Sequence, residues 1–431
     1  MREGWTKTSL GNVCGIQSGS GFPKRLQGSA DGDYPFYKVS DMNASGNERF
    51  MSKSSNYISD GIRKELGAKI FSKGALIFPK VGGAIVTNKK RQITAASCVD
   101  NNVMGLIPNL DFIDPDFLRY FMDSVDIYDL SNKANPPSIR QITVSNWPVL
   151  LPPLPEQKRI VAILDEAFSG IDTAIANTEK NLANARELFE SYLNSVFIKN
   201  SSAWGKGRLE TICEKITVGH VGSMASRYKP EGVPLLRSQN IRPFNVDLNK
   251  VVFIDEGFHK ELKKSALQPG DLGIVRTGYP GTAAVIPDSL PVANCSDLVI
   301  VRPGERVLSD FLAIVFNSYY GKKEVAGVLV GAAQKHFNVT AAKAALIPLP
   351  AIDEQRRVVV ECSDLREEHQ RLESIYQQKL TALTELKQSL LQKAFSGELT
   401  ADRAGHEIEG AAIAARISSR GGSPLRRRLA I

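Results

Sequence analysis

Hydrophobic residues in two long stretches of this chain recur every three or four positions, which is the spacing of one face of an α-helix. The first stripe comprises Ile160, Leu164, Ile171, Ile175, Leu182 and Phe189. The second comprises Val358, Leu365, Leu372, Tyr376, Leu383 and Leu390. Each stripe approximates a heptad repeat but contains one extra step of four residues, a stutter. The pattern predicts two long helices, over residues 151–199 and 350–397.

The two predicted helices are copies of one another. Glu156-Gln157-Lys158-Arg159 aligns with Glu354-Gln355-Arg356-Arg357, at an offset of 198 residues (354 − 156). A helix of about 44 residues is roughly 65 Å long, so one small domain cannot cover its whole apolar stripe. We therefore predict that the two helices pair as an antiparallel coiled coil with internal pseudo-two-fold symmetry. The alternative, in which each helix folds back on its own globular module, stays open.

The residues before each helix repeat as well. Trp5 and Cys14 correspond to Trp204 and Cys213, an offset of 199 residues in each case (204 − 5; 213 − 14). Many short apolar runs end in polar or Gly-rich turns, which is typical of short strands, and helical patterns are few. We predict an α+β fold with two globular modules in tandem. Domain 1 covers residues 1–150 and domain 2 covers residues 200–349, while residues 398–431 form a basic tail that we expect to be disordered.

Composition limits the possible partners and locations. The net charge of +8 and the pI near 9.1 favour an acidic polymer as partner. There is no run of 18 or more apolar residues and no signal-peptide pattern at the start of the sequence. We therefore expect a cytoplasmic protein without a membrane partner. The five cysteines are too few for a disulfide framework and are best explained as buried core thiols.

Motifs for catalysis are incomplete in this sequence. There is no phosphate-binding loop for ATP, and Asn135-Pro136-Pro137-Ser138 lacks the aromatic residue that adenine methyltransferases place after Asn-Pro-Pro. Glu261-Leu262-Lys263 fits the end of a nuclease signature, but no Pro-Asp pair precedes it at a suitable spacing. The five histidines are scattered without metal-ligand spacing. We predict no catalytic residue and no metal site, which disfavours an autonomous methyltransferase or nuclease.

Three pairs of loops, at matching positions in the two modules, carry the residue types that contact DNA bases and phosphates. The first pair offers Lys38, Ser40 and Asp41, with Arg237, Gln239 and Asn240. The second offers Lys80, with Arg276, Thr277 and Tyr279. The third offers Lys133, Asn135, Ser138 and Arg140, with Gln334, Lys335 and His336. Any one of these residues can also be an ordinary solvated side chain; the repeated placement favours double-stranded DNA as the ligand.

This combination of features resembles the specificity (S) subunit of type I restriction-modification enzymes. The resemblance rests on the hinge and helix start Leu151-Pro-Pro-Leu-Pro-Glu-Gln-Lys-Arg-Ile-Val161, on the ending Lys393-Ala-Phe-Ser-Gly-Glu-Leu399 and on the duplicated architecture. It implies that each module is a target recognition domain for one half of a split DNA site. It also implies that the helices serve as spacer and docking surface for two modification (M) subunits, which restriction (R) subunits join.

The resemblance further implies that this chain is the non-catalytic DNA-recognition subunit of such a complex. The assembled complex is a type I site-specific deoxyribonuclease and adenine DNA methyltransferase, so the resemblance places S-adenosylmethionine, ATP and Mg on the partner subunits and no cofactor on this chain. The alternative from another class is a non-enzymatic protein-interaction scaffold with a coiled-coil core. Large apolar surface loops would favour that scaffold, whereas the loops described above are basic and rich in amides.

Overall fold

The computed structural model describes residues 4–200, 203–329 and 336–400, with a mixed content of helices and strands. The expected disordered tail lies, except for its first three residues, outside the described residues. The chain divides into two compact units. Unit 1 contains the described residues of Met1–Asn177 and Lys379–Ile431, and unit 2 contains those of Thr178–Gln378. In the described part of the chain, no helix combines the length and the apolar character needed to cross a membrane.

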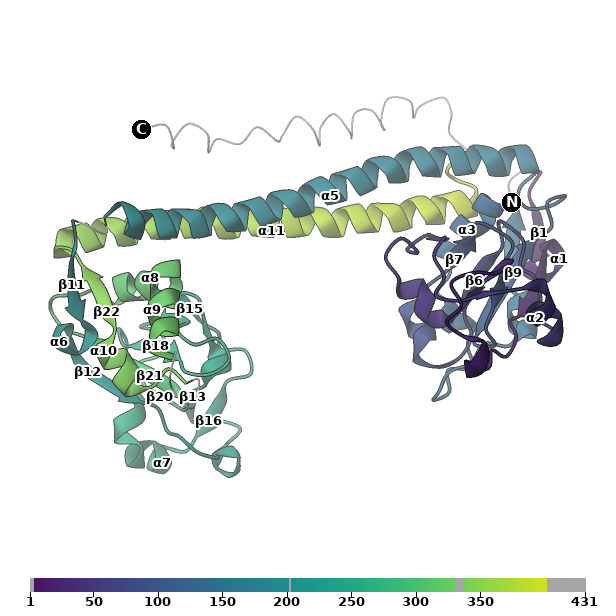
Figure 1. Cartoon of the computed structure of the whole chain (residues 1–431). Coiled ribbons are helices and arrows are strands. Elements are labelled where there is room, and N and C mark those ends of the chain that lie inside the picture. Colours follow the sequence, from purple (N-terminus) through teal and green to yellow (C-terminus); the bar gives the residue numbers. More distant parts are fainter. Residues whose placement is uncertain (1–3, 201–202, 330–335, 401–431) are drawn as a thin grey trace. The chain divides into compact units, whose positions relative to one another are not determined.

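Unit 1 is built on two sheets and one separate strand pair (Figure 1). The larger sheet has the order β2-β9-β6-β7-β4: Cys14–Ser18, Val103–Pro108, Leu76–Pro79, Arg91–Ile93 and Phe50–Met51. The smaller sheet has the order β5-β3-β8: Tyr57–Ile58, Tyr34–Tyr37 and Cys98–Val99. The pair joins β1 (Thr6–Ser9) to β10 (Pro148–Leu151). The short α-helices are α1 (Leu10–Val13), α2 (Asp60–Glu65), α3 (Pro115–Asp123) and α4 (Gln141–Ser145), and the 3-10 helices are η1 (Lys24–Leu26), η2 (Val39–Asn43), η3 (Gly82–Thr87) and η4 (Ile127–Leu130).

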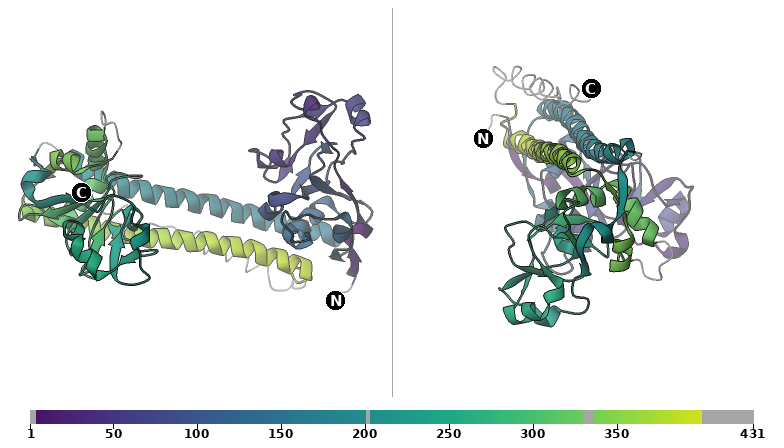
Figure 2. Two further views of the ribbon diagram at one scale, coloured as in Figure 1. Left: turned by 90° about the horizontal axis from the view of Figure 1, so that it is seen from below. Right: turned by 90° about the vertical axis from the view of Figure 1, so that its left-hand side faces the viewer.

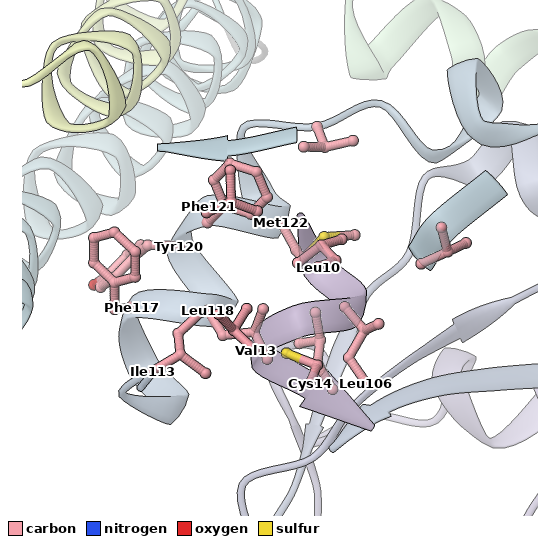
Figure 3. Packing of buried hydrophobic residues seen from close by; sticks show 14 of the residues in the cluster. Leu10, Val13, Cys14, Leu106, Ile113, Phe117, Leu118, Tyr120, Phe121 and Met122 are labelled. Carbon is pink, nitrogen blue, oxygen red and sulfur yellow. The ribbon is translucent and has the colours of Figure 1, made fainter. Parts of the chain in front are cut away.

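The core of unit 1 lies between the larger sheet, α1 and α3 (Figure 3). Asp114 caps α3, because its side chain accepts hydrogen bonds from the N–H groups of Asp116 and Phe117, and Pro115 occupies the first helical position. The helix then buries one apolar residue after another, including Phe117 at 0% exposure, against the sheet. Full burial of a side chain of this size contributes about 1.5–3 kcal/mol.

Unit 2 has the same kinds of sheets. The order β12-β21-β18-β19 comprises Cys213–Val218, Leu298–Pro303, Leu272–Val275 and Ala283–Val285. The order β16-β13-β20-β17 comprises Val252–Ile254, Val233–Leu236, Ala293–Cys295 and Ala266–Leu267. Strand β11 (Gly205–Arg208) pairs with β22 (Leu346–Leu349), and β14 (Ile241–Arg242) pairs with β15 (Asn245–Val246). The short helices are α6 (Leu209–Ile212), α7 (Glu256–Glu261), α8 (Ser309–Asn317), α9 (Tyr319–Leu329), α10 (Val339–Ala344), η5 (Ala225–Arg227), η6 (Ser238–Asn240) and η7 (Lys263–Ser265).

The strand orders of the two units correspond. Strands β2, β9, β6 and β7 follow one another in the larger sheet of unit 1 as β12, β21, β18 and β19 do in unit 2. The central strand of each smaller sheet pairs in parallel with the strand that carries a buried cysteine, Cys98 in β8 and Cys295 in β20. The repeat in the sequence is therefore matched by a repeat in topology: corresponding strands follow the same order in unit 1 and in unit 2.

The long helices are α5 (Leu154–Lys199) and α11 (Ile352–Ser396). In unit 1, the first part of α5 lies beside the last part of α11 (Figure 1; Figure 2). There Lys387 forms an ion pair with Asp172 and lies 5.2 Å from the centroid of the Phe168 ring. In unit 2, Arg186 Nε lies 2.6 Å from Glu373 Oε1, and Tyr192 donates a hydrogen bond of 2.8 Å to Glu361.

Every residue predicted for helix pairing is buried or half-buried. The first turns of each helix also belong to the core of a globular module. Ile160 and Leu164 belong to the core cluster of unit 1, and Val358 belongs to that of unit 2. The same clusters also contain residues of the other long helix, Leu391 and Ala394 in unit 1 and Leu193, Val196 and Phe197 in unit 2. At the start of each helix, a globular module and the other long helix therefore contribute to one core.

The Glu-Gln motif anchors the start of each helix. Gln157 is fully buried; its Oε1 accepts from the Asp114 N–H (2.8 Å), and its Nε2 donates to the carbonyls of Phe112 (2.8 Å) and Pro152 (2.9 Å). Gln355 repeats this arrangement. Its amide accepts from the Leu308 N–H at 2.9 Å and donates to the carbonyls of Arg306 at 3.0 Å and Pro350 at 2.9 Å. Each glutamine joins the hinge, the long helix and the loop that precedes α3 in unit 1 or α8 in unit 2.

Candidate nucleic-acid interface

The three predicted loops of unit 1 lie next to one another at one edge of its sheets. The Asp100 N–H donates to the Tyr37 carbonyl (2.9 Å), which connects the first loop to the turn after β8. The Lys80 N–H donates to Asn102 O (2.8 Å), and the Lys80 carbonyl accepts from the Ile139 N–H (2.9 Å). These bonds connect the first, second and third loops through the turn at residues 100–102.

Two ammonium groups are held by side chains at this edge. Lys38 Nζ donates to Gln27 Oε1 at 2.9 Å, and Lys80 Nζ donates to Ser18 Oγ at 3.0 Å. The pKa of the Asp100 carboxyl is raised, because burial outweighs the opposing effects of its hydrogen bond from the Asn102 N–H and of the positive charge of Lys38. Both lysines are half-buried, so their charges are positioned rather than freely mobile.

The remaining candidates of unit 1 differ in exposure. Ser40, Asn135 and Arg140 are exposed. Lys133 is also exposed and pairs with Asp129 at 3.1 Å, where the charge of the lysine is shared with a carboxylate. Ser138 is half-buried, and its N–H donates to Asn132 Oδ1 at 3.0 Å. The third loop therefore presents two cations and two short polar side chains around a turn that its own side chains stabilise.

In unit 2 the corresponding loops meet at Asp297. Arg276 Nη1 lies 3.0 Å from Asp297 Oδ1, and Ser238 Oγ donates to the Asp297 carbonyl at 3.2 Å. The Asp297 N–H donates to the His220 carbonyl (3.0 Å). This aspartate has a left-handed backbone (φ = 55°), a conformation that Asp and Asn tolerate better than most residues. It therefore connects the first and second loops of the unit to the turn after β12.

The third loop of unit 2 approaches the same place. The Phe337 N–H donates to the Arg276 carbonyl (3.1 Å), and Thr277 Oγ1 lies 2.9 Å from His336 Nδ1. Gln239 of the first loop and Tyr279 of the second loop are exposed. The candidates Gln334 and Lys335 lie outside the described residues. All three loops of each unit are thus represented in one network of contacts.

Two of the candidate DNA-binding residues are buried, which argues against their direct contact with DNA. Asp41 is 4% exposed and accepts hydrogen bonds from the Lys38 N–H (2.7 Å) and from Ser55 Oγ (3.1 Å). Asn240 is fully buried; it accepts from the Arg237 N–H at 3.0 Å and donates to the carbonyl of Asp247 at 2.9 Å. Both side chains stabilise the 3-10 turn that follows the central strand, so neither reaches a ligand. Polar residue type alone could not separate this role from recognition.

Two arginines of unit 2, Arg276 after β18 and Arg237 after β13, differ in environment. The side chain of Arg276 is only 14% exposed, and its Nε, within the described part of the chain, is buried without a hydrogen-bond partner. Its guanidinium is fixed on one side by Asp297 and offers a planar fork of donors. Arg237 donates to the Lys250 carbonyl at 2.9 Å and lies 5.6 Å from the centroid of the Tyr228 ring. Arg237 is thereby turned toward its own module.

The turn after β2 and β12 was missed as part of the site. The Ser20 N–H donates to the carbonyl of Val99 at 3.0 Å, and the His220 N–H donates to that of Cys295 at 2.9 Å. The preceding glycines gave a signal, since Gly19 and Gly219 are 200 residues apart (219 − 19). A Cβ on Gly19 would meet a backbone oxygen at 2.2 Å, and one on Gly219 would meet the Cys295 carbonyl oxygen at 2.8 Å. Glycine lets the two backbones approach this closely.

No group of three or more potential metal ligands occurs among the residues that the structure describes. In Asn135-Pro136-Pro137-Ser138, the Pro137 carbonyl accepts from the Gly82 N–H (2.8 Å). This hydrogen bond connects the segment to the second loop. What the two networks offer chemically is a set of positioned cations, hydroxyls and amides, the groups that bind phosphates and base edges.

Comparisons with known proteins agree with this chemistry. Residues 2–184 match the family model described as the type I restriction modification DNA specificity domain. The chain is 24% identical over 429 residues to the EcoKI specificity subunit of Escherichia coli strain K12, covering 93% of this chain and 90% of that protein. It is 23% identical over 428 residues to the StySPI specificity subunit of Salmonella potsdam, again covering 93% and 90%.

Solved structures show a similar fold. A chain from a study of complex assembly and conformational transition of the type I R-M system aligns with a TM-score of 0.73 at 19% identity, covering 93% of this chain and 99% of that one. The HsdS subunit from Thermoanaerobacter tengcongensis aligns with a TM-score of 0.57 at 20% identity, covering 93% and 98%.

Proposed function

Because the chain carries the type I restriction modification DNA specificity domain and belongs to the family of type I specificity subunits, we propose that it recognises DNA sequence for such a complex. One observation carries the proposal most directly. In each unit, three loops that are far apart in the sequence meet in one network that includes a strand-end cation, Lys80 or Arg276. In this role the chain has no catalytic task.

Recognition of two different sequences follows from the two networks. We infer that the globular part of each unit, residues 1–150 and residues 200–349, is a target recognition domain for one half of a split site. Exposed cations such as Arg140 are suited to phosphates, whereas Gln239 and the fixed Arg276 are suited to base edges. The positioned side chains of these networks are mostly cations, hydroxyls and amides, which favours DNA over the protein-interaction scaffold.

The long helices have a supporting role in this proposal. Within unit 2, α5 residues of rising number contact α11 residues of falling number: Arg186 contacts Glu373, and Tyr192 contacts Glu361. We propose that this pattern reflects an antiparallel coiled coil with internal pseudo-two-fold symmetry, which offers equivalent surfaces to two modification subunits. Restriction subunits would join that assembly. The binding of S-adenosylmethionine, ATP and Mg by those partners, and a cytoplasmic location, remain part of the proposal.

The test uses the chain assembled with its modification subunits. Methylation of a library of random duplexes, followed by sequencing of the methylated positions, should yield one split sequence with an unspecified middle. Binding to that sequence should weaken steeply with added salt, because phosphate contacts release counterions. An active complex that methylates adenines without sequence preference would disprove the recognition role.

A further inference from the structure

Tyr279 projects from the tip of the hairpin that joins β18 to β19. Its side chain is 82% exposed, more than any other large hydrophobic side chain in the described part of the chain. The hairpin is closed directly behind it: the Gly281 N–H donates to the Val275 carbonyl at 3.0 Å, and the Thr282 N–H donates to the carbonyl of Tyr279 at 3.2 Å. The ring is therefore displayed by an ordered turn.

The backbone of this turn is constrained. Gly278 (φ = 91°) and Gly281 (φ = 88°) both adopt left-handed conformations that favour glycine. A Cβ on Gly281 would come within 3.0 Å of the Val325 side chain, so the base of the turn lies against α9. Because the backbone is held on both sides, Tyr279 has only its two side-chain torsions to fix when it binds a ligand, a small entropic cost.

Polar groups surround the base of the hairpin. Thr277 Oγ1 contacts His336 Nδ1 at 2.9 Å, and the preceding Arg276 pairs with Asp297. The aromatic ring thus stands next to the groups that are candidates for phosphate and base contacts. An exposed ring in such a setting suits a ligand that presents both charges and flat apolar faces, as nucleic acid does.

Unit 1 lacks this feature at the same position. Lys80 follows β6 as Arg276 follows β18, but the segment from Lys80 to Lys90 contains no aromatic residue. The next residue, Val81, forms a backbone bridge with Ser138. The ring is therefore a property of unit 2 alone.

On the basis of the DNA-recognition role proposed above, we propose that Tyr279 stacks on a base at an opened step within the half-site bound by unit 2. Pyrimidine–purine steps unstack most easily, and inserted side chains exploit such steps. The half-site bound by unit 2 then contains a deformable step that is selected through its flexibility. The half-site bound by unit 1 is read without such a step.

The experiment uses the chain assembled with its modification subunits and duplexes that carry the methylated sequence. 2-Aminopurine, whose fluorescence rises when it unstacks, replaces successive bases of each half-site. We expect a rise of at least twofold at one step of one half-site only. Tyr279→Ala should abolish that rise and weaken binding roughly tenfold, in line with the usual contribution of a base–aromatic stack. Tyr279→Phe, which keeps the ring, should retain both properties.

Tyr319 provides a matched control, because it is an exposed tyrosine of the same unit at the start of α9. Tyr319→Ala should leave the fluorescence and the affinity unchanged. Specific binding that survives Tyr279→Ala undiminished would overturn the stacking role while leaving the proposed function intact. A Tyr279→Phe variant as weak as Tyr279→Ala would also overturn it, since the hydroxyl would then be the contact. Binding by the unsubstituted complex without sequence preference would overturn the proposed function itself.

Discussion

The loop after β6 in unit 1 and the loop after β18 in unit 2 begin at the same strand position and then diverge. In unit 1 the strand-end cation is Lys80, which contacts a serine, and the loop continues as the 3-10 helix η3. In unit 2 the cation is Arg276, which contacts the carboxylate of Asp297, and the loop is a tight turn with Tyr279 at its tip. The strands before the two loops are buried along their whole lengths. The tips can therefore change while the frame beneath them remains.

The frame itself shows the opposite behaviour. Gln157 and Gln355 make three hydrogen bonds each, with the same kinds of partners and nearly the same lengths. Asp41 and Asn240 both accept a hydrogen bond from the backbone N–H three residues earlier. Positions that satisfy buried backbone groups keep their geometry in both units, whereas positions that face solvent differ. This division is what a reader of two unlike sequences on one scaffold requires.

The largest effect should come from the buried glutamines. Replacing Gln157 or Gln355 by Leu keeps the volume but leaves one N–H and two carbonyls without their partners. Each variant should lower the free energy of unfolding by roughly 3 kcal/mol, because buried unsatisfied groups cost about 1–3 kcal/mol each and are not additive. Urea unfolding of the whole chain measures this loss.

The exposed neighbours Lys158 and Arg356 serve as controls, and their replacement by Ala should change the unfolding free energy by no more than about 0.5 kcal/mol. A large loss for one glutamine but not for the other would contradict the equivalence of the two frames.

The second effect concerns sequence preference. Arg276→Lys removes the planar fork but keeps a positive charge beside Asp297. Preference at one base pair of the half-site bound by unit 2 should fall by about tenfold or more, since a bidentate contact contributes about 1–3 kcal/mol of discrimination. Methylation rates on duplexes with single base changes measure this preference.

Lys80→Arg is the reciprocal change in unit 1 and should alter only the other half-site. Equal loss of preference in both half-sites after the Arg276 substitution would show that the two loops do not read separate sequences.

Helical periodicity and the internal offset carried most of the information about the fold. The apolar stripes lie at the positions of α5 and α11, because a helical stripe that runs from Ile160 to Phe189 or from Val358 to Leu390 has few alternatives to a long helix. The sequence does not show which residues cover the first turns of α5 and α11, since Ile160 and Val358 share a core with module residues that are distant in the sequence. The Glu-Gln motif was recognised only as a repeat; its three partners come from two separate segments.

The candidate site was predicted in outline. Matching offsets identified the loops around Lys80 and Arg276, which do meet other candidate loops in the folded units. Burial separated Asp41 and Asn240 from the exposed candidates, and burial depends on tertiary packing that residue type does not encode. Asp297 was missed because its partners, Arg276, Ser238 and His220, are brought together only by the sheet.

A smaller effect should distinguish the two turn-stabilising residues. Asn240→Asp removes the donor to the Asp247 carbonyl and places a charge at a fully buried position, so it should cost about 2 kcal/mol of unfolding free energy. Asp41→Asn loses only one of two accepted hydrogen bonds and should cost about 1 kcal/mol. Thermal unfolding in parallel with the unsubstituted chain compares them. An equal or reversed order would show that the two turns are stabilised differently from the arrangement described here.

The smallest effect concerns the thiols, which form corresponding pairs in the two units. Burial raises the pKa of Cys14 and Cys213 from the ordinary value of 9.0 to about 12, that of Cys98 to about 11, and that of Cys295 as well. A raised thiol pKa keeps the sulfur protonated, and only the thiolate reacts with iodoacetamide. At pH 8 the folded chain should therefore react roughly a hundredfold or more slowly than the urea-unfolded chain, since two pKa units change the thiolate fraction by about that factor. The unfolding free energy should also fall as the pH rises above 9, because the thiols then ionise in the unfolded state while they stay protonated in the folded state.

Mass spectrometry of the alkylated chain identifies the order in which the cysteines react with iodoacetamide. Cys213, which is half-buried, should react before its buried counterpart Cys14, and the reverse order would contradict the packing difference between the two units.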